Sequence, residues 1–113
     1  MICRLWRGST TTANAYAYER FLRDDVLPAI ASRRIAGLER TDFLRREVDD
    51  GVEFVTLMWF ESIEAIRAFA GTDDYAVARV ADADRALLRD FDSRAVHFEV
   101  VSAALPVSAR KPA

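Results

Sequence analysis

The stretch VEFVTLMWF, residues 52–60, decides the fold, because both of its faces are largely apolar. Successive side chains of a β-strand point to opposite sides, so a strand here places alternate residues on two surfaces. One surface carries Val52, Phe54, Thr56, Met58 and Phe60, and the other carries Glu53, Val55, Leu57 and Trp59. This composition is typical of a strand in a sheet that is covered on both sides. The fold must therefore provide two coverings for one strand.

The segments around this strand predict a regular alternation of strands and helices. Asp49-Asp50-Gly51 is a tight hairpin signal, and Ser62 and Gly71 are typical residues for the start and the stop of a helix. We expect strands over residues 2–9, 38–48, 52–60 and 93–102, and helices over 13–30, 62–70 and 73–81, with a further helix capped by Asp82. The order is β-α-β-β-α-β with the second helical region in pieces. It predicts a ferredoxin-like α+β fold, an antiparallel sheet with helices on one face.

Helices in this arrangement cover only one face of the sheet. The strand at 52–60 requires burial on both faces, and a chain of 113 residues has nothing left for a second layer. The sheet of a partner subunit is the simplest cover, which predicts a homodimer packed sheet against sheet. The alternative is a solvated face with a few exposed apolar residues.

Length and composition exclude several classes of function. The 113 residues, with a net charge of −2, are expected to form one domain over 1–103 and a flexible tail over 104–113. The basic residues are spread along the chain, whereas a nucleic-acid surface needs them clustered. No apolar run predicts a membrane span, and no signal-peptide pattern is present. The lone Cys3 predicts a reducing, cytoplasmic environment, and the acidic doublets lack metal-site spacing, so we expect no metal.

A longer stretch of the sequence resembles a known family. VTLMWFESIEAIRAFAGTDDYAVAR (55–79), preceded by the hairpin signal and followed by VHFEV (96–100), is similar to the antibiotic biosynthesis monooxygenase superfamily of dimeric α+β barrels. The resemblance covers residues 2–101 and implies the same fold and a dimer. The family includes quinone-forming monooxygenases without a cofactor, haem-degrading enzymes and members without known activity, so the resemblance leaves the reaction open.

The haem-degrading branch has a residue pattern that this chain does not keep. Aligned on Glu61-Ser62, the resemblance puts Phe69 where that branch has its catalytic tryptophan and Arg79 where it has its haem-binding histidine. Near the position of an asparagine on the first strand, this chain has Arg4 and Trp6. A guanidinium stays protonated and has no lone pair to give to iron. The sequence therefore predicts a protein without a haem cofactor.

The quinone-forming branch makes fewer demands. A deprotonated phenol or anthrone can itself reduce dioxygen, so the protein must bind an aromatic molecule, help to remove its proton and stabilise the anion. The expected function is therefore a cofactor-independent monooxygenase acting on a small aromatic substrate. The alternative is a non-catalytic dimeric barrel that binds a small ligand or has a structural role.

The only histidine, His97, is one candidate for a catalytic role. It titrates near neutrality, and the last strand is expected to lie antiparallel to the first, where Arg4 and Trp6 share a face. Beside Arg4 or Glu99, His97 is either a base or a hydrogen-bonding residue of the dimer interface. Arg4 and Trp6 are candidate substrate-binding residues on the same face.

The other candidates lie where the third strand meets the helices. Trp59 either stacks on a substrate or closes the end of the core, and Tyr75 either binds a substrate oxygen or belongs to the core. Arg79, four residues after Tyr75, either stabilises an anion or pairs with Asp73 or Asp82. We expect the stop at Gly71 to open a mainly apolar pocket between the helix at 62–70, the first helix and the sheet. Phe69 and Tyr75 should line it, with Trp59 near its rim.

A titration with hemin tests the residue assignments of the haem-degrading branch. Phe69 and Arg79 stand where that branch has its catalytic tryptophan and its haem-binding histidine. We therefore expect no stoichiometric complex with a sharp Soret band and no biliverdin-like product under reductant. Tight binding with turnover would show that the alignment on Glu61-Ser62 is wrong.

Overall fold

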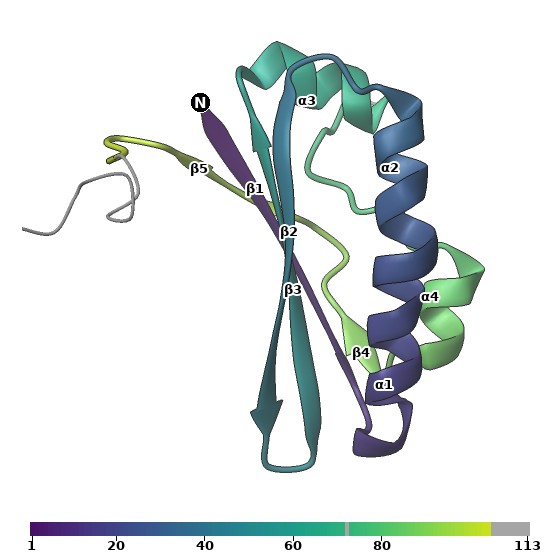
Figure 1. The fold of residues 1–113 in the computed structure, drawn as a ribbon. Coiled ribbons are helices and arrows are strands. Elements are labelled where there is room, and N and C mark those ends of the chain that lie inside the picture. The colour runs from purple at the N-terminus through teal and green to yellow at the C-terminus, as the bar shows by residue number, and fades with distance from the viewer. Residues whose placement is uncertain (72, 105–113) are drawn as a thin grey trace, which may run out of the picture.

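The computed structural model describes residues 1–71 and 73–104, and in it the helices lie on one side of an antiparallel sheet (Figure 1). The strands are β1 (Ile2–Thr10), β2 (Leu38–Val48), β3 (Gly51–Phe60), β4 (Asp90–Phe91) and β5 (Val96–Glu99). The helices are α1 (Thr12–Phe21), the π-helical η1 (Leu22–Val26), α2 (Leu27–Arg33), α3 (Ile63–Ala70) and α4 (Asp82–Leu87). From residue 105 on, the tail expected over 104–113 lies outside the described residues.

The sheet has the strand order β2-β3-β1, and both β4 and β5 pair with β1. All pairs are antiparallel, and β2 and β3 form the hairpin expected at Gly51. Helix α3 begins and ends as expected: the Ser62 side chain accepts a hydrogen bond from the Ala65 N–H, and Gly71 takes a left-handed φ of 68°. The ferredoxin-like α+β fold is confirmed.

The core lies between the helices and one face of β3. Two clusters of buried residues form it. The first contains Ala15, Tyr18, Leu22, Val52 and Phe54, and the second contains Met58, Phe60 and Ile66. Burial of each large apolar side chain stabilises the fold by roughly 1.5–3 kcal/mol. The helix-facing surface of β3 is thus the one that carries Val52 and Phe60.

Helices α1, η1 and α2 follow one another as a single rod across the sheet (Figure 1). The sequence predicts a helix over 13–30 that is weakened at Pro28, whereas the structure continues it to Arg33. In η1 the Leu27 N–H donates to the Leu22 carbonyl, five residues earlier. This wider turn directly precedes Pro28, which lies in the first turn of α2, where a missing N–H is tolerated. None of the helices in the described ranges has the length and apolar character needed to cross a membrane.

The helix expected over 73–81 does not form. The segment instead lies beside residues 93–95, where the Ala95 N–H donates to the Ala76 carbonyl at 2.7 Å. The Asp74 side chain also accepts a hydrogen bond from the Ala76 N–H. Short helices are marginal on their own, so turn bonds and backbone bonds to a neighbouring segment replace the helical ones.

The strand expected over 93–102 is shorter, and a separate two-residue strand, β4, precedes it. Gly8 pairs with Phe91 in β4, and Leu5 pairs with Val96 in β5. From one pair to the other, β1 advances three residues (8 to 5) and the opposite segment five (91 to 96). The two additional residues separate β4 from β5 along β1.

Helix α4 starts one residue earlier than expected. Ala81 precedes it in an extended conformation, so Asp82 is its first residue rather than its cap, and Asp84 is the third. Leu87 and Leu88 pack against the first core cluster.

The face of the sheet that points away from the helices carries apolar side chains. Leu44, Val96 and Phe98 are 48%, 48% and 53% exposed. Leu57 and Leu5 lie on this face as well, because directly paired residues share a face. No described segment of the chain covers it.

Candidate functional site

A pocket lies between the helices and the sheet, beside the end of α3. Its volume is about 260 Å³, and an apolar cavity smaller than this already holds benzene. Its lining is Arg4, Trp6, Phe43, Thr56 and Met58 from the sheet, Tyr18, Leu22, Val26, Ile30 and Arg33 from the rod, and Phe69, Ala70, Val77, Ala78, Arg79, Val80 and Asp84 from the later segments. The pocket therefore lies where the sequence predicts one, next to the stop at Gly71.

The floor of the pocket contains a buried cation. Arg4 is only 7% exposed. Its Nη1 donates to the Tyr75 carbonyl at 2.6 Å, and its Nη2 donates to the Val77 carbonyl at 3.4 Å. Burial lowers the pKa of Arg4, yet a guanidinium remains charged in proteins. No carboxylate in the described part of the chain forms an ion pair with it.

His97 lies beside this cation, as the pairing of β1 with β5 predicts. Its Nε2 is 3.0 Å from Nη1 of Arg4. Arginine only donates, so Nε2 is the acceptor and the ring is neutral, with its proton on Nδ1. Burial and the nearby charge of Arg4 lower the pKa of His97. His97 is not among the residues that line the pocket.

Three arginines line the pocket: Arg4, Arg33 and Arg79. The guanidinium carbons of Arg4 and Arg33 lie 5.6 and 5.1 Å from the ring centroid of Phe69. Both distances are within the range of a cation–π interaction. Among the ion pairs of the described residues, none joins Arg79 to Asp73 or Asp82, the partners that the sequence suggested. The pocket therefore combines apolar walls with positive charge.

Trp6 is held in a fixed orientation at the pocket wall. Its indole N–H donates to the Asp92 carbonyl at 2.7 Å, and its ring lies 6.3 Å from that of Phe91. The indole nitrogen is thus occupied, and the ring is available as an apolar contact surface.

Tyr75 and Trp59 do not line the pocket. The ring of Tyr75 contacts the ring of His97 edge to face, with centroids 5.1 Å apart. Trp59 lies on the opposite face of the sheet, where its indole N–H donates to Asp42 Oδ2 at 3.0 Å. Trp59 lies on that face because side chains alternate along β3, so Met58 points toward the helices and Trp59 points away from them. Of the aromatic residues expected at the pocket, Phe69 lines it.

Tyr18 lines the pocket from α1, and Asp84 lines it from α4, although nothing in the sequence predicts Asp84 there. Tyr18 is fully buried, and its hydroxyl donates to Asp84 Oδ1 at 2.9 Å. Burial raises the pKa of Asp84, and the hydrogen bond from Tyr18 opposes that rise. In the sequence, Asp84 looks like an ordinary acidic residue in the first turn of a helix. Its position in the pocket follows only from the packing of α4 against α1.

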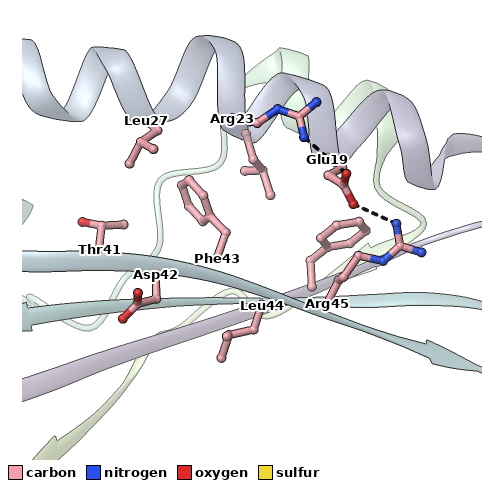
Figure 2. A pocket seen from close by; sticks show the side chains of 10 residues that line it. Glu19, Arg23, Leu27, Thr41, Asp42, Phe43, Leu44 and Arg45 are labelled. Atoms are coloured by element: carbon pink, nitrogen blue, oxygen red, sulfur yellow. Dashed lines mark hydrogen bonds and ion pairs between the residues drawn. The ribbon is translucent and has the colours of Figure 1, made fainter. Parts of the chain in front are cut away.

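A second hollow of about 290 Å³ lies between the rod and β2 (Figure 2). Its charged groups are paired, since Glu19 accepts from Arg45 at 2.8 Å and from Arg23 at 3.5 Å. Figure 2 shows Phe43 pointing toward the rod and Leu44 pointing away from it. None of the residues with an expected functional role lies there.

The lining of the first pocket does not fit haem. It contains no histidine or cysteine, and the lone pair on Nε2 of His97 is engaged by Arg4. The described residues also contain no cluster of metal-ligating side chains. No reaction step through a haem iron follows from these side chains.

Replacement of His97 by Gln tests its neutral state. A folded-state pKa below the unfolded value of about 6.5 means that the unfolded chain takes up the proton first as pH falls. The stabilisation is therefore complete above that value and is lost as pH falls through the folded-state pKa. Between about pH 7.5 and 5.5, the free energy of unfolding measured with urea should fall more for the wild type than for His97→Gln. The amide oxygen of the glutamine can still accept a hydrogen bond from Arg4. An equal fall in the free energy of unfolding for both proteins would contradict the neutral state of His97.

Solved structures with the same fold are found in several bacteria. A proposed antibiotic biosynthesis monooxygenase from Deinococcus radiodurans has a TM-score of 0.65 at 17% identity, covering 95% of this chain and 99% of that one. A second protein of that description, from Bacillus cereus, has a TM-score of 0.60 at 17% identity, with 93% and 97% covered. The haem-degrader of Mycobacterium tuberculosis, which holds two haems in its active site, has a TM-score of 0.57 at 20% identity, with 92% and 99% covered.

The sequence itself gives no such match. No protein-family model and no curated protein matches the chain. At identities of 17% and 20%, the likeness shows the fold and does not carry over a reaction. The resemblance to antibiotic biosynthesis monooxygenase-like proteins is therefore confirmed for the ferredoxin-like α+β fold, over nearly the whole chain.

Proposed function

We propose that the chain is a cofactor-independent monooxygenase that oxidises a small phenol or anthrone with dioxygen. The observation that supports this is the charge of the pocket: among the described residues, three arginines and one aspartate line a mainly apolar space. Such a site stabilises an aromatic anion more than its neutral parent. The anion is the species that reduces dioxygen.

The reaction needs dioxygen and the substrate alone. After loss of a proton, the anthrone carbon bonds to one oxygen atom and the O–O bond breaks. That carbon becomes a carbonyl, and the second oxygen atom leaves as water, so CH₂ and O₂ give C=O and H₂O. The protein has to lower the free energy of the anion and exclude water from it.

The pocket residues divide into contact and positioning roles. Trp6 and Phe69 offer apolar ring surfaces to a flat substrate, and Arg4 and Arg79 face the developing negative charge. His97 acts through Arg4, because its Nε2 is the acceptor for that guanidinium. The Tyr75 backbone carbonyl fixes the same group.

We further propose that the chain is a homodimer packed through the face of the sheet opposite the helices. Three exposed apolar residues there, Leu44, Val96 and Phe98, lie alongside Leu57. A second copy would remove this surface from water and supply the missing cover of β3. On this proposal Trp59 belongs to the interface. A cytoplasmic location stays a prediction from the lone Cys3.

Oxygen uptake with 1,8-dihydroxyanthrone tests the reaction. We expect the wild type to accelerate uptake above the spontaneous rate and to form the anthraquinone. Arg79→Ala should lower the rate by at least about tenfold, because it removes a positive charge that stabilises the anion. It breaks no ion pair among the described residues. Arg20→Ala, on the exposed side of α1, is the control and should behave as the wild type. No acceleration by the wild type would favour the ligand-binding alternative, and an unchanged Arg79→Ala rate would remove Arg79 from the mechanism.

Sedimentation of two neighbouring charge substitutions tests the dimer. Leu57→Arg places a charge on the open face of the sheet and should give a folded monomer where the wild type sediments as a dimer. Met58→Arg is the matched contrast: Met58 is 6% exposed beneath the helices, and an unpaired charge there costs several kcal/mol, about enough to unfold the chain. A monomeric wild type at micromolar concentration would contradict the proposal.

A further inference from the structure

The oxidation proposed above requires a group that accepts the substrate's proton, and the only histidine is poorly placed for that task. Its Nε2 already accepts a hydrogen bond from Arg4 at 3.0 Å, and its ring does not line the pocket. A base must come within hydrogen-bond distance of the proton that it removes. A base for this reaction is therefore expected among the side chains that line the pocket.

Asp84 is the one carboxylate among the lining residues that the structure describes. It comes from α4, whereas Arg4 comes from β1, so the acid and the buried cation enter the pocket from different elements. The Tyr18 hydroxyl donates to its Oδ1 at 2.9 Å. Tyr18 is fully buried, and this bond fixes the carboxylate at the pocket wall.

The surroundings of Asp84 change how readily its carboxylate takes up a proton. Burial is the main influence and raises its pKa, while the bonds from Tyr18 and from the backbone at Ala81 lower it. Burial likewise raises the pKa of Tyr18, so its hydroxyl keeps its proton and acts as a donor. The other charged groups facing the pocket are Arg4, Arg33 and Arg79.

We propose that Asp84 is the general base of this pocket and that Tyr18 positions it. The Asp84 carboxylate takes the proton from the acidic C–H or O–H of the aromatic substrate, and the electron pair stays on the substrate. The resulting anion lies beside the guanidinium groups. After reaction with dioxygen, the proton on Asp84 passes to the oxygen atom that leaves as water.

This inference rests on the proposed function, so its test separates proton removal from oxidation. Under anaerobic conditions in D₂O, NMR follows the exchange of the methylene protons of 1,8-dihydroxyanthrone. We expect the wild type to accelerate this exchange and Asp84→Asn to lose at least about a hundredfold of the acceleration. Asp82→Asn, an exposed acid in the same helical turn, is the matched control and should exchange as the wild type.

A positioning role for Tyr18 has its own signature. Tyr18→Phe removes the donor that favours the ionised carboxylate, so the acid limb of the pH–rate profile should move to higher pH. A role confined to packing would lower stability and leave that limb in place. Thermal unfolding of each variant shows whether the fold is retained.

The outcomes are distinct. Exchange that depends on Asp84, without oxygen uptake, would support the base and overturn the oxidation. Oxygen uptake that is unchanged in folded Asp84→Asn would overturn the base and leave the oxidation standing. A wild type that does not accelerate exchange would overturn the assignment of Asp84 as the base. An acid limb that stays in place in folded Tyr18→Phe would overturn the positioning role of Tyr18.

Discussion

The buried guanidinium of Arg4 needs hydrogen-bond acceptors, and the segment after α3 is arranged to provide them. The carbonyls of Tyr75 and Val77 and the ring nitrogen of His97 accept from it. A buried charge without such partners would cost several kcal/mol, so the contacts tie this segment and β5 to β1. Neutral acceptors satisfy the donors of Arg4 without cancelling its charge. The pocket above it therefore keeps a positive character that a carboxylate partner would have removed.

The alternation of the sheet separates two surfaces with different physical properties. One side of β3 packs beneath the helices and ends at the pocket, and the other carries an apolar face. Catalysis and assembly would therefore use opposite sides of the same strand. A change such as Leu57→Arg reaches one surface without touching the other, which allows the two proposals to be tested apart.

Local signals in the sequence predict most of the fold. Ser62 and Gly71 set the limits of α3, and the two-faced strand at 52–60 identifies the centre of the sheet, because capping and alternation act over a few residues. The place of His97 beside Arg4 also follows from strand pairing. The course of residues 73–80 does not, since its backbone bonds go to a segment distant in sequence. For the same reason Asp84 could not be found, because a tyrosine on α1 gives it its setting.

The central claim is that the pocket stabilises an aromatic anion, and the ionisation of a bound dye measures this most directly. Alizarin, a hydroxyanthraquinone, changes colour when its phenol loses a proton, so its visible spectrum reports its charge in the complex. A pocket with the uncancelled charge of Arg4 should bind the dye and lower the pH at which it ionises, relative to the free dye. Ionisation of the bound dye at the same or a higher pH would contradict the account.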